Sequence, residues 1–448
     1  MKRIKVFLAV LFCRCVRLAA KLVGRGSSIP GLITLKLFPG ILGDIEMPKL
    51  VIAVTGSNGK TSTVEMIHKV LLDGGLTVAC NSEGSNQTEG VATCILANCT
   101  LSGKVKTDVV LLESDEQYAQ HTFKYFQPDY FFITNLYRDQ LTRNGHPEWI
   151  ANVISRSFSD KMTLVLNRDD PLVSSLGEGR EKVIYFGADH LKGDKTVNTS
   201  IYNDGSYCPI CKHPLKYDYY HYNHIGSYHC DNCGFKRNKT DYTLTAADFD
   251  EGYIVINEQY RINLAFKGIY HCYNTLAAFT AGAIAGVSPE SAVKTLNNYN
   301  MTSGRVQKVV FGGREGTLLA SKHENSISYD RSIDVAIADK NRPDVMIIVD
   351  AISRKYFTSE TSWLWDIDFE NLNNENIGNI VLAGRYCYDL AARFEYTGIP
   401  AEKIQVFESI PARADWLKQD REHPFYVITC FADSGKVLAL SEIKGVRL

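Results

Sequence analysis

Four cysteines in the middle of the chain have the spacing of a metal site. Two residues separate Cys208 from Cys211, eighteen separate Cys211 from Cys230, and two separate Cys230 from Cys233. This C-x2-C-x18-C-x2-C pattern is typical of a tetrahedral Zn²⁺ site with one thiolate ligand from each cysteine. Because the cysteines fill all four positions, the pattern predicts a closed, structural site with no open position for catalysis.

The stretch VTGSNGKTST (residues 54–63) is typical of a loop that binds nucleotide phosphates. Two glycines allow a tight turn, and the N–H groups of the loop and of the next helix would point at phosphate oxygens. Lys60 would reach the outer phosphates, and Thr61 would place its hydroxyl on Mg²⁺. Val54 stands where the full GxxxxGK[ST] pattern has its first glycine. The candidate ATP-binding residues of the loop are Gly56, Asn58, Gly59, Lys60, Thr61 and Ser62.

Glu113 ends a later apolar run in the sequence LLESDE. A carboxylate at this position could hold a divalent cation, because hard cations prefer oxygen ligands. Acids often end strands without any such role. The phosphate loop earlier in the chain therefore decides the interpretation, and we predict that Glu113 is a Mg²⁺ ligand and part of the catalytic site.

Short apolar runs that end in a polar or glycine residue predict the strands that position these groups. The runs are residues 50–56, 109–114, 130–135, 163–167 and 183–187. Helical patterns separate several of them, including residues 61–75 directly after the phosphate loop and a later one at 274–288. This alternation predicts a parallel sheet wrapped by helices, with ligands bound beyond the carboxyl ends of the strands.

The region around residues 200–240 breaks this alternation, because it is rich in Tyr, His and Asn and has no long apolar run. We interpret it as an insertion, a four-cysteine zinc ribbon, which the metal holds together because it is too small to build its own core. Three histidines close to the cysteines could compete as ligands, although the complete cysteine set argues against it: His221, His224 and His229.

The sequence predicts an α/β protein in three parts. Residues 1–48 form a basic arm, residues 49–300 form the central ATP-binding domain with the insertion, and residues 301–448 form a smaller Rossmann-like domain. The composition turns polar near residues 298–306, which predicts a hinge. Beyond it, apolar runs at 344–351, 379–384, 403–407 and 425–430 alternate with helical patterns.

Composition limits the class of protein. The chain has 448 residues, of which 45% are hydrophobic and 22% charged, as expected for a globular protein of two or three domains. A formal net charge of −1 gives no argument for a nucleic-acid partner. Eight further cysteines show no disulfide-like framework, which favours a reducing, cytoplasmic setting: Cys13, Cys15, Cys80, Cys94, Cys99, Cys272, Cys387 and Cys430.

The N-terminal arm is basic and amphipathic. It contains no acid before Asp44, and on a helix a row of apolar residues shares one face: Leu8, Leu11, Cys15, Leu18 and Leu22. The apolar run at residues 6–13 is too short and too closely followed by cations to span a bilayer. Two interpretations stay open and do not exclude each other. The arm packs on its own domain, or it lies on the anionic inner face of the membrane.

Six motifs follow one another in an order that resembles the Mur ligase family. They are VTGSNGKTST, the Glu113 strand, TNLYRDQLTR (134–143), LNRDDP (166–171), YNTLAA (273–278) and SGRVQ (303–307). Over nearly all of residues 15–400 the chain is most similar to the MurT-type ligase subunits of lipid II isoglutaminyl synthase. Those subunits also carry a Cys ribbon inside the central domain. The resemblance implies a Mur ligase-like fold.

The resemblance also implies roles for single residues. Lys60 and Thr61 would handle the ATP phosphates and Mg²⁺, and Glu113 would be a metal ligand. Three further residues would contact the nucleotide, the last of them when the domains close: Asn167, Asn274 and Arg305.

The stretch TSETSWLWDIDFE (358–370) departs from the family pattern. The family has an Asp three residues before the Trp, and this acid completes the glutaminase triad of a partner subunit. Here that position is Glu360, with Asp366 as the reserve candidate. Without the family, the stretch would be an amphipathic turn with buried tryptophans and solvated acids. SKHENSISYD (321–330) and CFADSGK (430–436) also depart from the family, so the differences concentrate in the C-terminal domain.

The activity that the resemblance implies is ATP-dependent amidation. The α-carboxyl of D-glutamate in the lipid II stem peptide would become an acyl phosphate, and ammonia from a separate GatD-type glutaminase subunit would convert it to D-isoglutamine. Two alternatives stay open: a stand-alone Mur-like ligase that adds an amino acid, and a divergent, non-catalytic binding subunit. The intact Gly59, Lys60, Thr61 and Glu113 argue against the second.

Overall fold

The structure, a computed structural model, describes residues 2–22, 24, 26–82, 85–139, 145–201, 203–265, 268–299, 306–322, 324–351, 360–410, 423–443 and 446–447. The chain divides into two compact units. Unit 1 comprises residues 1–137, 146–199 and 203–301, and unit 2 comprises residues 138–145, 200–202 and 302–448.

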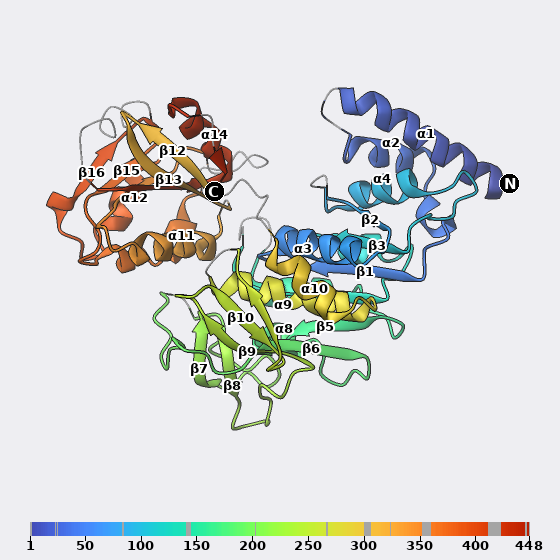
Figure 1. Cartoon of the computed structure of the whole chain (residues 1–448), viewed down its shortest axis with the longest axis horizontal. Coiled ribbons are helices and arrows are strands. Elements are labelled where there is room, and N and C mark those ends of the chain that lie inside the picture. The colour runs from blue at the N-terminus through green and yellow to red at the C-terminus, as the bar shows by residue number, and fades with distance from the viewer. Residues whose placement is uncertain are drawn as a thin grey trace. The chain divides into compact units, whose positions relative to one another are not determined.

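Unit 1 is built on a nine-stranded sheet with the order β11-β10-β9-β6-β5-β4-β1-β3-β2 (Figure 1). The strands are β1 (Leu50–Thr55), β2 (Val78–Cys80), β3 (Val109–Glu113), β4 (Tyr130–Ile133), β5 (Thr163–Asn167), β6 (Val183–Ala188), β9 (Tyr242–Asp248), β10 (Tyr253–Ile256) and β11 (Tyr260–Asn263). The five strands predicted from the apolar runs are β1, β3, β4, β5 and β6, and they pair in parallel, which confirms the predicted parallel sheet. The strands β2 and β9–β11 were not predicted: β2 has only three residues, and β9–β11 form an antiparallel edge of the sheet.

Helices cover this sheet on both faces. They are α1 (Lys2–Leu22), α2 (Ile29–Leu37), α3 (Lys60–Asp73), α4 (Thr88–Asn98), α5 (Ala119–Thr122), α7 (Pro147–Ser155), α8 (Pro171–Ser175), α9 (Ile269–Ile284) and α10 (Pro289–Asn297), with a 3-10 turn η1 (Ile41–Asp44). Helices α3, α9 and α10 pack together, and α1, α2 and α4 form a second group (Figure 1). The helix predicted at 274–288 begins five residues earlier, at Ile269.

The N-terminal arm packs on unit 1, as one of the two interpretations expected. Val6, Ala9, Val10 and Cys13 of α1 are buried in the hydrophobic core that also contains the sheet residue Val51. Among the described residues, no helix combines the length and apolar character that crossing a bilayer requires.

The insertion forms a hairpin outside the main sheet. Its strands β7 (Lys216–Tyr222) and β8 (Ile225–His229) pair with each other in antiparallel fashion and form a two-stranded sheet of their own. The strands that flank the insertion, β6 and β9, pair in parallel. The insertion therefore leaves the central sheet continuous.

Unit 2 contains a seven-stranded sheet with the order β16-β15-β14-β17-β13-β12-β18. The strands are β12 (Val306–Phe311), β13 (Arg314–Ser321), β14 (Asp344–Ile348), β15 (Ile380–Ala383), β16 (Ile404–Phe407), β17 (Phe425–Cys430) and β18 (Val446–Arg447). The helices are α11 (Ser326–Ala338), α12 (Cys387–Phe394) and α14 (Phe431–Leu440), with 3-10 turns η2 (Ser362–Asp366), η3 (Phe369–Leu372) and η4 (Ala401–Lys403). The four predicted runs are β14, β15, β16 and β17, and in the structure they pair in parallel.

Candidate active site and metal centre

The phosphate loop connects β1 to α3, and its two glycines have conformations that other residues rarely adopt. Gly56 has φ 141° and Gly59 has φ 79°. A Cβ atom on Gly59 would lie 2.5 Å from Oδ1 of Asn274, so the helix carrying Asn274 also requires a glycine here. Helix α3 begins at Lys60, directly after Gly59, which has no side chain to cap it. The N–H groups of the first turn are therefore suited to an anion.

Asn135, which follows β4, holds the loop in place. Its carbonyl accepts a hydrogen bond from the Ser57 N–H at 2.9 Å. Its side-chain oxygen accepts from the Asn58 N–H at 2.8 Å, and its side-chain nitrogen donates to the Asn58 carbonyl at 3.0 Å. Sequence reasoning did not single out Asn135. The available signal was its position at the carboxyl end of a strand that neighbours β1.

Lys60 is buried and forms an ion pair with Glu116, and its ammonium group also donates to the Gly56 carbonyl. The side chain of Glu116 is only 5% exposed. Glu116 was missed in the sequence, although it follows Glu113 closely in the run LLESDE. The Glu116 carboxylate and the Gly56 carbonyl therefore fix the Lys60 ammonium group beside the phosphate loop, because a buried cation requires such partners.

Glu113 lies at the same edge of the sheet as the phosphate loop, because β3 pairs with β1 and places Glu113 opposite Val54. Its side chain is half-buried and accepts a hydrogen bond from the Asn86 amide at 3.1 Å. The side chain of Asn81 bridges the Glu113 backbone with two bonds of 2.8 and 2.9 Å. Thr61, the other predicted Mg²⁺ ligand, is exposed in the first turn of α3.

Of the residues predicted to contact the nucleotide, one lies beside the phosphate loop and another is buried with its amide already hydrogen-bonded. Asn274 lies beside the loop, where its Oδ1 accepts a hydrogen bond from Thr63 at 3.2 Å. Asn167 is fully buried, and its amide donates to the Thr134 carbonyl at 3.0 Å and accepts from the Asp169 N–H at 3.1 Å. Arg305 lies outside the described residues.

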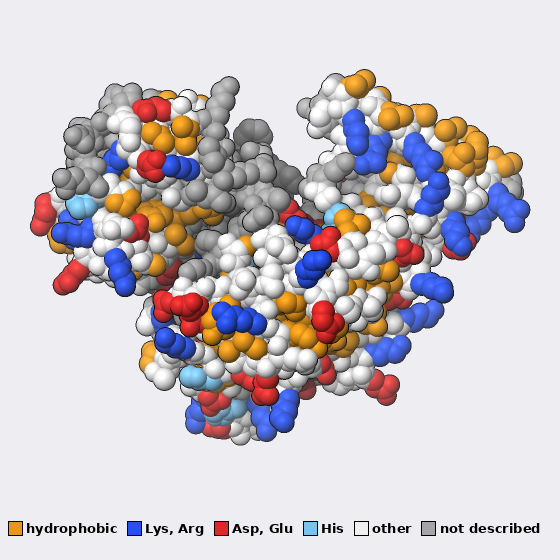
Figure 2. Space-filling model, viewed as in Figure 1, with side chains coloured by type: hydrophobic (Ala, Val, Ile, Leu, Met, Phe, Trp, Pro, Cys, Tyr) orange, Lys and Arg blue, Asp and Glu red, His pale blue; other side chains and the backbone are white. Residues whose placement is uncertain are grey.

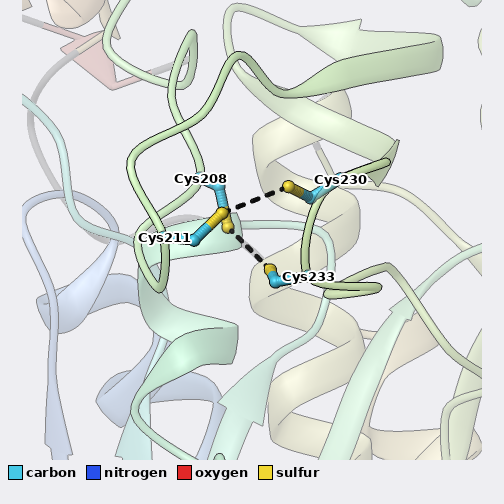
Figure 3. A group of neighbouring side chains, drawn as sticks. All are labelled: Cys208, Cys211, Cys230 and Cys233. Atoms are coloured by element: carbon cyan, nitrogen blue, oxygen red, sulfur yellow. Dashed lines mark hydrogen bonds between the residues drawn. The ribbon is translucent and has the colours of Figure 1, made fainter.

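The four cysteines of the insertion face one another (Figure 3). The Sγ atoms of Cys208 and Cys233 are 3.6 Å apart, those of Cys211 and Cys230 are 3.5 Å apart, and all four lie within 4.8 Å of one another. Ligands at about 2.3 Å from a tetrahedral Zn²⁺ would be roughly 3.8 Å apart, so the thiols fit such an ion. The histidines of the insertion are not part of this cluster.

Two equivalent turns present the thiols. In each turn the N–H of the first cysteine bonds to a carbonyl five residues later, at 2.8 Å from Cys208 to His213 and at 2.8 Å from Cys230 to Phe235. A backbone hydrogen bond from His213 lowers the pKa of the Cys211 thiol to about 5, whereas burial raises the pKa of Cys208 to about 12. A divalent cation at the centre would favour the thiolate form of every member.

The insertion reaches the phosphate loop through two tyrosines. The hydroxyl of Tyr222, at the end of β7, bonds to the hydroxyl of Tyr137 at 2.7 Å, and both side chains are buried. Tyr137 in turn donates its backbone N–H to the Ser57 hydroxyl at 2.9 Å. Burial, together with the neighbouring Tyr222, raises the pKa of Tyr137 well above its usual range. The phenol of Tyr137 therefore stays neutral and acts as a hydrogen-bonding group.

In unit 2, the two candidate triad acids differ in their surroundings. Glu360 is exposed, and its carboxylate accepts a hydrogen bond from the Ser362 N–H at 2.7 Å. Hydrogen bonds from Ser362 lower the pKa of Glu360 below its usual range. Asp366 is half-buried and forms an ion pair with Arg138 at 3.4 Å. Glu360 is therefore the more accessible acid.

Comparisons with known proteins agree with these features. Residues 54–234 match the Mur ligase middle domain, and residues 323–433 match the MurT ligase C-terminal domain. The chain is 30% identical over 435 residues to the MurT subunit of lipid II isoglutaminyl synthase (glutamine-hydrolyzing) from Streptococcus pneumoniae, covering 95% of each chain. It is 29% identical over 391 residues to the corresponding subunit from Staphylococcus aureus, covering 86% of this chain and 87% of that one.

Solved structures show the same fold. A pseudomurein peptide ligase type C from Methanothermus fervidus superposes with a TM-score of 0.67 at 19% identity, covering 91% of this chain and 83% of the other. The mixed α/β fold with parallel sheets is thus that of the Mur ligases. Together with the near full-length similarity to the pneumococcal subunit, it shows that this chain belongs to the MurT family of Mur ligases.

Proposed function

We propose that this chain is the ATP-dependent ligase subunit of a lipid II isoglutaminyl synthase. The observation that carries the proposal is the similarity to a MurT subunit over 95% of both chains. The phosphate loop, the buried Lys60 and the position of Glu113 beside the loop support it. In this proposal the central domain comprises residues 49–300 and the Rossmann-like C-terminal domain residues 301–448.

The reaction joins ammonia to a carboxyl group at the expense of ATP. An oxygen of the D-glutamate α-carboxylate attacks the γ-phosphorus and ADP leaves, which gives an acyl phosphate. The nitrogen of ammonia then attacks the acyl carbon and phosphate leaves, which gives D-isoglutamine. Lys60 and the N–H groups at the start of α3 would offset the charge of the triphosphate, because carboxylate and triphosphate repel each other. Asn274 and Arg305 would contact the nucleotide, as would Asn167 after a rearrangement of its amide.

Two metals belong to the proposal. Thr61 and Glu113 would hold Mg²⁺, which neutralises phosphate charge when bound. The four cysteines of the insertion would hold a structural Zn²⁺, and the Sγ separations of 3.5 and 3.6 Å support this. The insertion would then be a zinc ribbon.

A GatD-type glutaminase subunit would supply the ammonia. The exposed carboxylate of Glu360, ionised and anchored by Ser362, supports a role in the glutaminase triad of that partner. The substrate is a lipid-linked precursor, so the proposal includes a contact between the N-terminal arm and the membrane.

The test uses the purified chain with ATP, Mg²⁺ and lipid II, with and without the glutaminase subunit. Mass spectrometry of the product should show amidation with ammonium for the chain alone, and amidation with glutamine only when the partner is added. Incorporation of an amino acid in place of ammonia would support the stand-alone ligase instead. Absence of lipid II-dependent ATP hydrolysis under all conditions would support a non-catalytic binding subunit.

A further inference from the structure

Helix α1 has apolar residues on two faces, and its own unit covers only one of them. Val6, Ala9, Val10 and Cys13 are buried in the core of unit 1. Six large apolar residues form a separate row at helical spacing and stay exposed: Ile4 (65%), Phe7 (42%), Leu8 (47%), Leu11 (42%), Leu18 (71%) and Leu22 (89%). This exposed row needs an explanation, because contiguous exposed apolar surface marks an interaction site.

Helix α2, which packs against α1, extends the surface with Leu32, Ile33 and Leu37. These nine residues make up nine of the 21 large hydrophobic side chains exposed in the described part of the chain, although they come from only 34 consecutive positions. Figure 2 shows hydrophobic side chains along the outer edge of α1, with Lys and Arg side chains beside them. We call the nine residues the arm surface.

The first 43 residues carry charges of one sign only. Residues 1–43 contain eight cations and no acid: Lys2, Arg3, Lys5, Arg14, Arg17, Lys21, Arg25 and Lys36. Asp44 pairs with Lys2 at 3.2 Å and with Lys5 at 3.1 Å, which leaves an excess of seven positive charges. Because the whole chain has a net charge of −1, this excess is local and is balanced elsewhere in the molecule.

We propose that the arm surface docks on an anionic phospholipid membrane. The exposed row would enter the boundary between headgroups and acyl chains, and the surrounding cations would pair with anionic headgroups. The helix would lie in the plane of the membrane, because its opposite face is fixed to the core of unit 1 by Val6, Ala9 and Val10. A second copy of the chain fits less well, since each arm carries an excess of positive charge and two such surfaces would repel each other.

This inference deepens the proposed function, because it places the ligase beside a substrate that carries a lipid anchor. It rests on the surface alone and does not depend on ATP chemistry. Vesicle binding can therefore fail while amidation stands, and amidation can fail while vesicle binding stands.

The experiment is flotation of the full-length chain with phosphatidylcholine vesicles that contain or lack phosphatidylglycerol, without ATP and without the partner. The wild type should float with the anionic vesicles, and added salt should weaken binding because exposed charges are screened. Leu18→Gln with Leu22→Gln should lower the partition coefficient by about tenfold or more, since each removes a large apolar side chain from the surface. Arg3→Gln with Lys36→Gln should lower binding to anionic vesicles only.

The matched control is Leu72→Gln with Val197→Gln, which removes two exposed apolar residues of unit 1 outside the arm (46% and 66% exposed). This variant should float like the wild type. Failure of the wild type to float, or equal losses in the control and in the Leu18, Leu22 variant, would overturn the proposal. So would loss of vesicle binding on addition of the glutaminase subunit, or a dimer that the Leu18, Leu22 variant abolishes, because either result would assign the surface to a protein partner.

Discussion

The phosphate loop of unit 1 is surrounded by its own chain, whereas Glu360 of unit 2 is presented to solvent. Asn135 and Tyr137, which follow β4, and Asn274 of α9 contact the loop from two separate parts of unit 1, and Lys60 is buried against Glu116. Glu360 is anchored by Ser362, two residues away in the sequence. The difference fits the proposal, in which the groups around the loop are fixed by this chain and the exposed acid serves a group supplied by another chain.

The largest expected effect tests the first half of this comparison. Lys60→Ala should lower amidation by about 10³–10⁵-fold with both glutamine and ammonium, because a cationic group at the transferring phosphoryl contributes on that scale. The measurement is the initial rate with each nitrogen source. Since Lys60→Ala leaves Glu116 buried without its cation, the double variant Lys60→Ala with Glu116→Gln separates lost chemistry from lost stability. Normal turnover in a folded double variant would contradict the role of Lys60.

Glu360→Gln tests the second half. The glutamine-dependent rate should fall by roughly 10³–10⁴-fold, the cost of removing a triad acid, while the ammonium-dependent rate should stay at the wild-type level. The matched variant is Asp366→Asn, which removes the acid that is paired with Arg138. If both nitrogen sources lose activity equally, Glu360 serves the ligase or the fold. If neither does, the partner completes its own triad.

Metal analysis tests whether the insertion, like the phosphate loop, is held by groups of this chain, in this case by four cysteines around a Zn²⁺ ion. The wild type should contain about one Zn²⁺ per chain, and Cys208→Ser should lose it. Unit 1 should then unfold at a lower temperature, because metal binding and local folding are linked. Retention of a full zinc equivalent by the double variant Cys208→Ser with Cys230→Ser would refute the site.

A smaller effect is expected where the insertion meets the phosphate loop. Tyr222→Phe removes the hydroxyl that bonds to Tyr137 and should weaken ATP binding by up to about fivefold, since such a bond contributes about 1 kcal/mol. The control is Tyr228→Phe, which removes a buried hydroxyl of the same hairpin that bonds to the Arg168 carbonyl at 2.9 Å. Both variants should lose similar thermal stability, and only Tyr222→Phe should change the Kd for ATP, measured by calorimetry. Equal Kd values would show that the insertion does not position the loop.

The last expected effect is on stability and not on activity, and it concerns the pH dependence of unit 1. Burial lowers the pKa of His271 on α9 to about 4. The unfolded chain, with a histidine pKa near 6.5, then binds more protons than the folded chain between about pH 6.5 and 4, so stability falls as the pH drops through this window. His271 should contribute roughly 2 kcal/mol of this loss at pH 5. His271→Gln should therefore lose less thermal stability between pH 7 and 5 than the wild type, and an identical loss would contradict the assignment.

Much of the fold could be predicted from the sequence, because buried parallel strands and their helices leave local patterns. The runs that became β1, β3, β4, β5 and β6 were apolar, ended in polar residues and alternated with helical segments. The strands β9–β11 were missed, since their burial depends on antiparallel pairing at the sheet edge and on α9 and α10.

The sequence by itself determined the sites whose functional groups lie within a few residues of one another. The two C-x2-C turns and the loop from Gly56 to Lys60 are short enough for residue type and spacing to define their backbone. Tertiary structure alone decided what surrounds them. The pairs Lys60–Glu116, Asn58–Asn135 and Tyr137–Tyr222 join residues 56, 77 and 85 positions apart. Such pairs depend on the order and register of the strands. Order and register result from many weak contacts throughout the sheet, so the spacing of the paired residues in the sequence does not predict them.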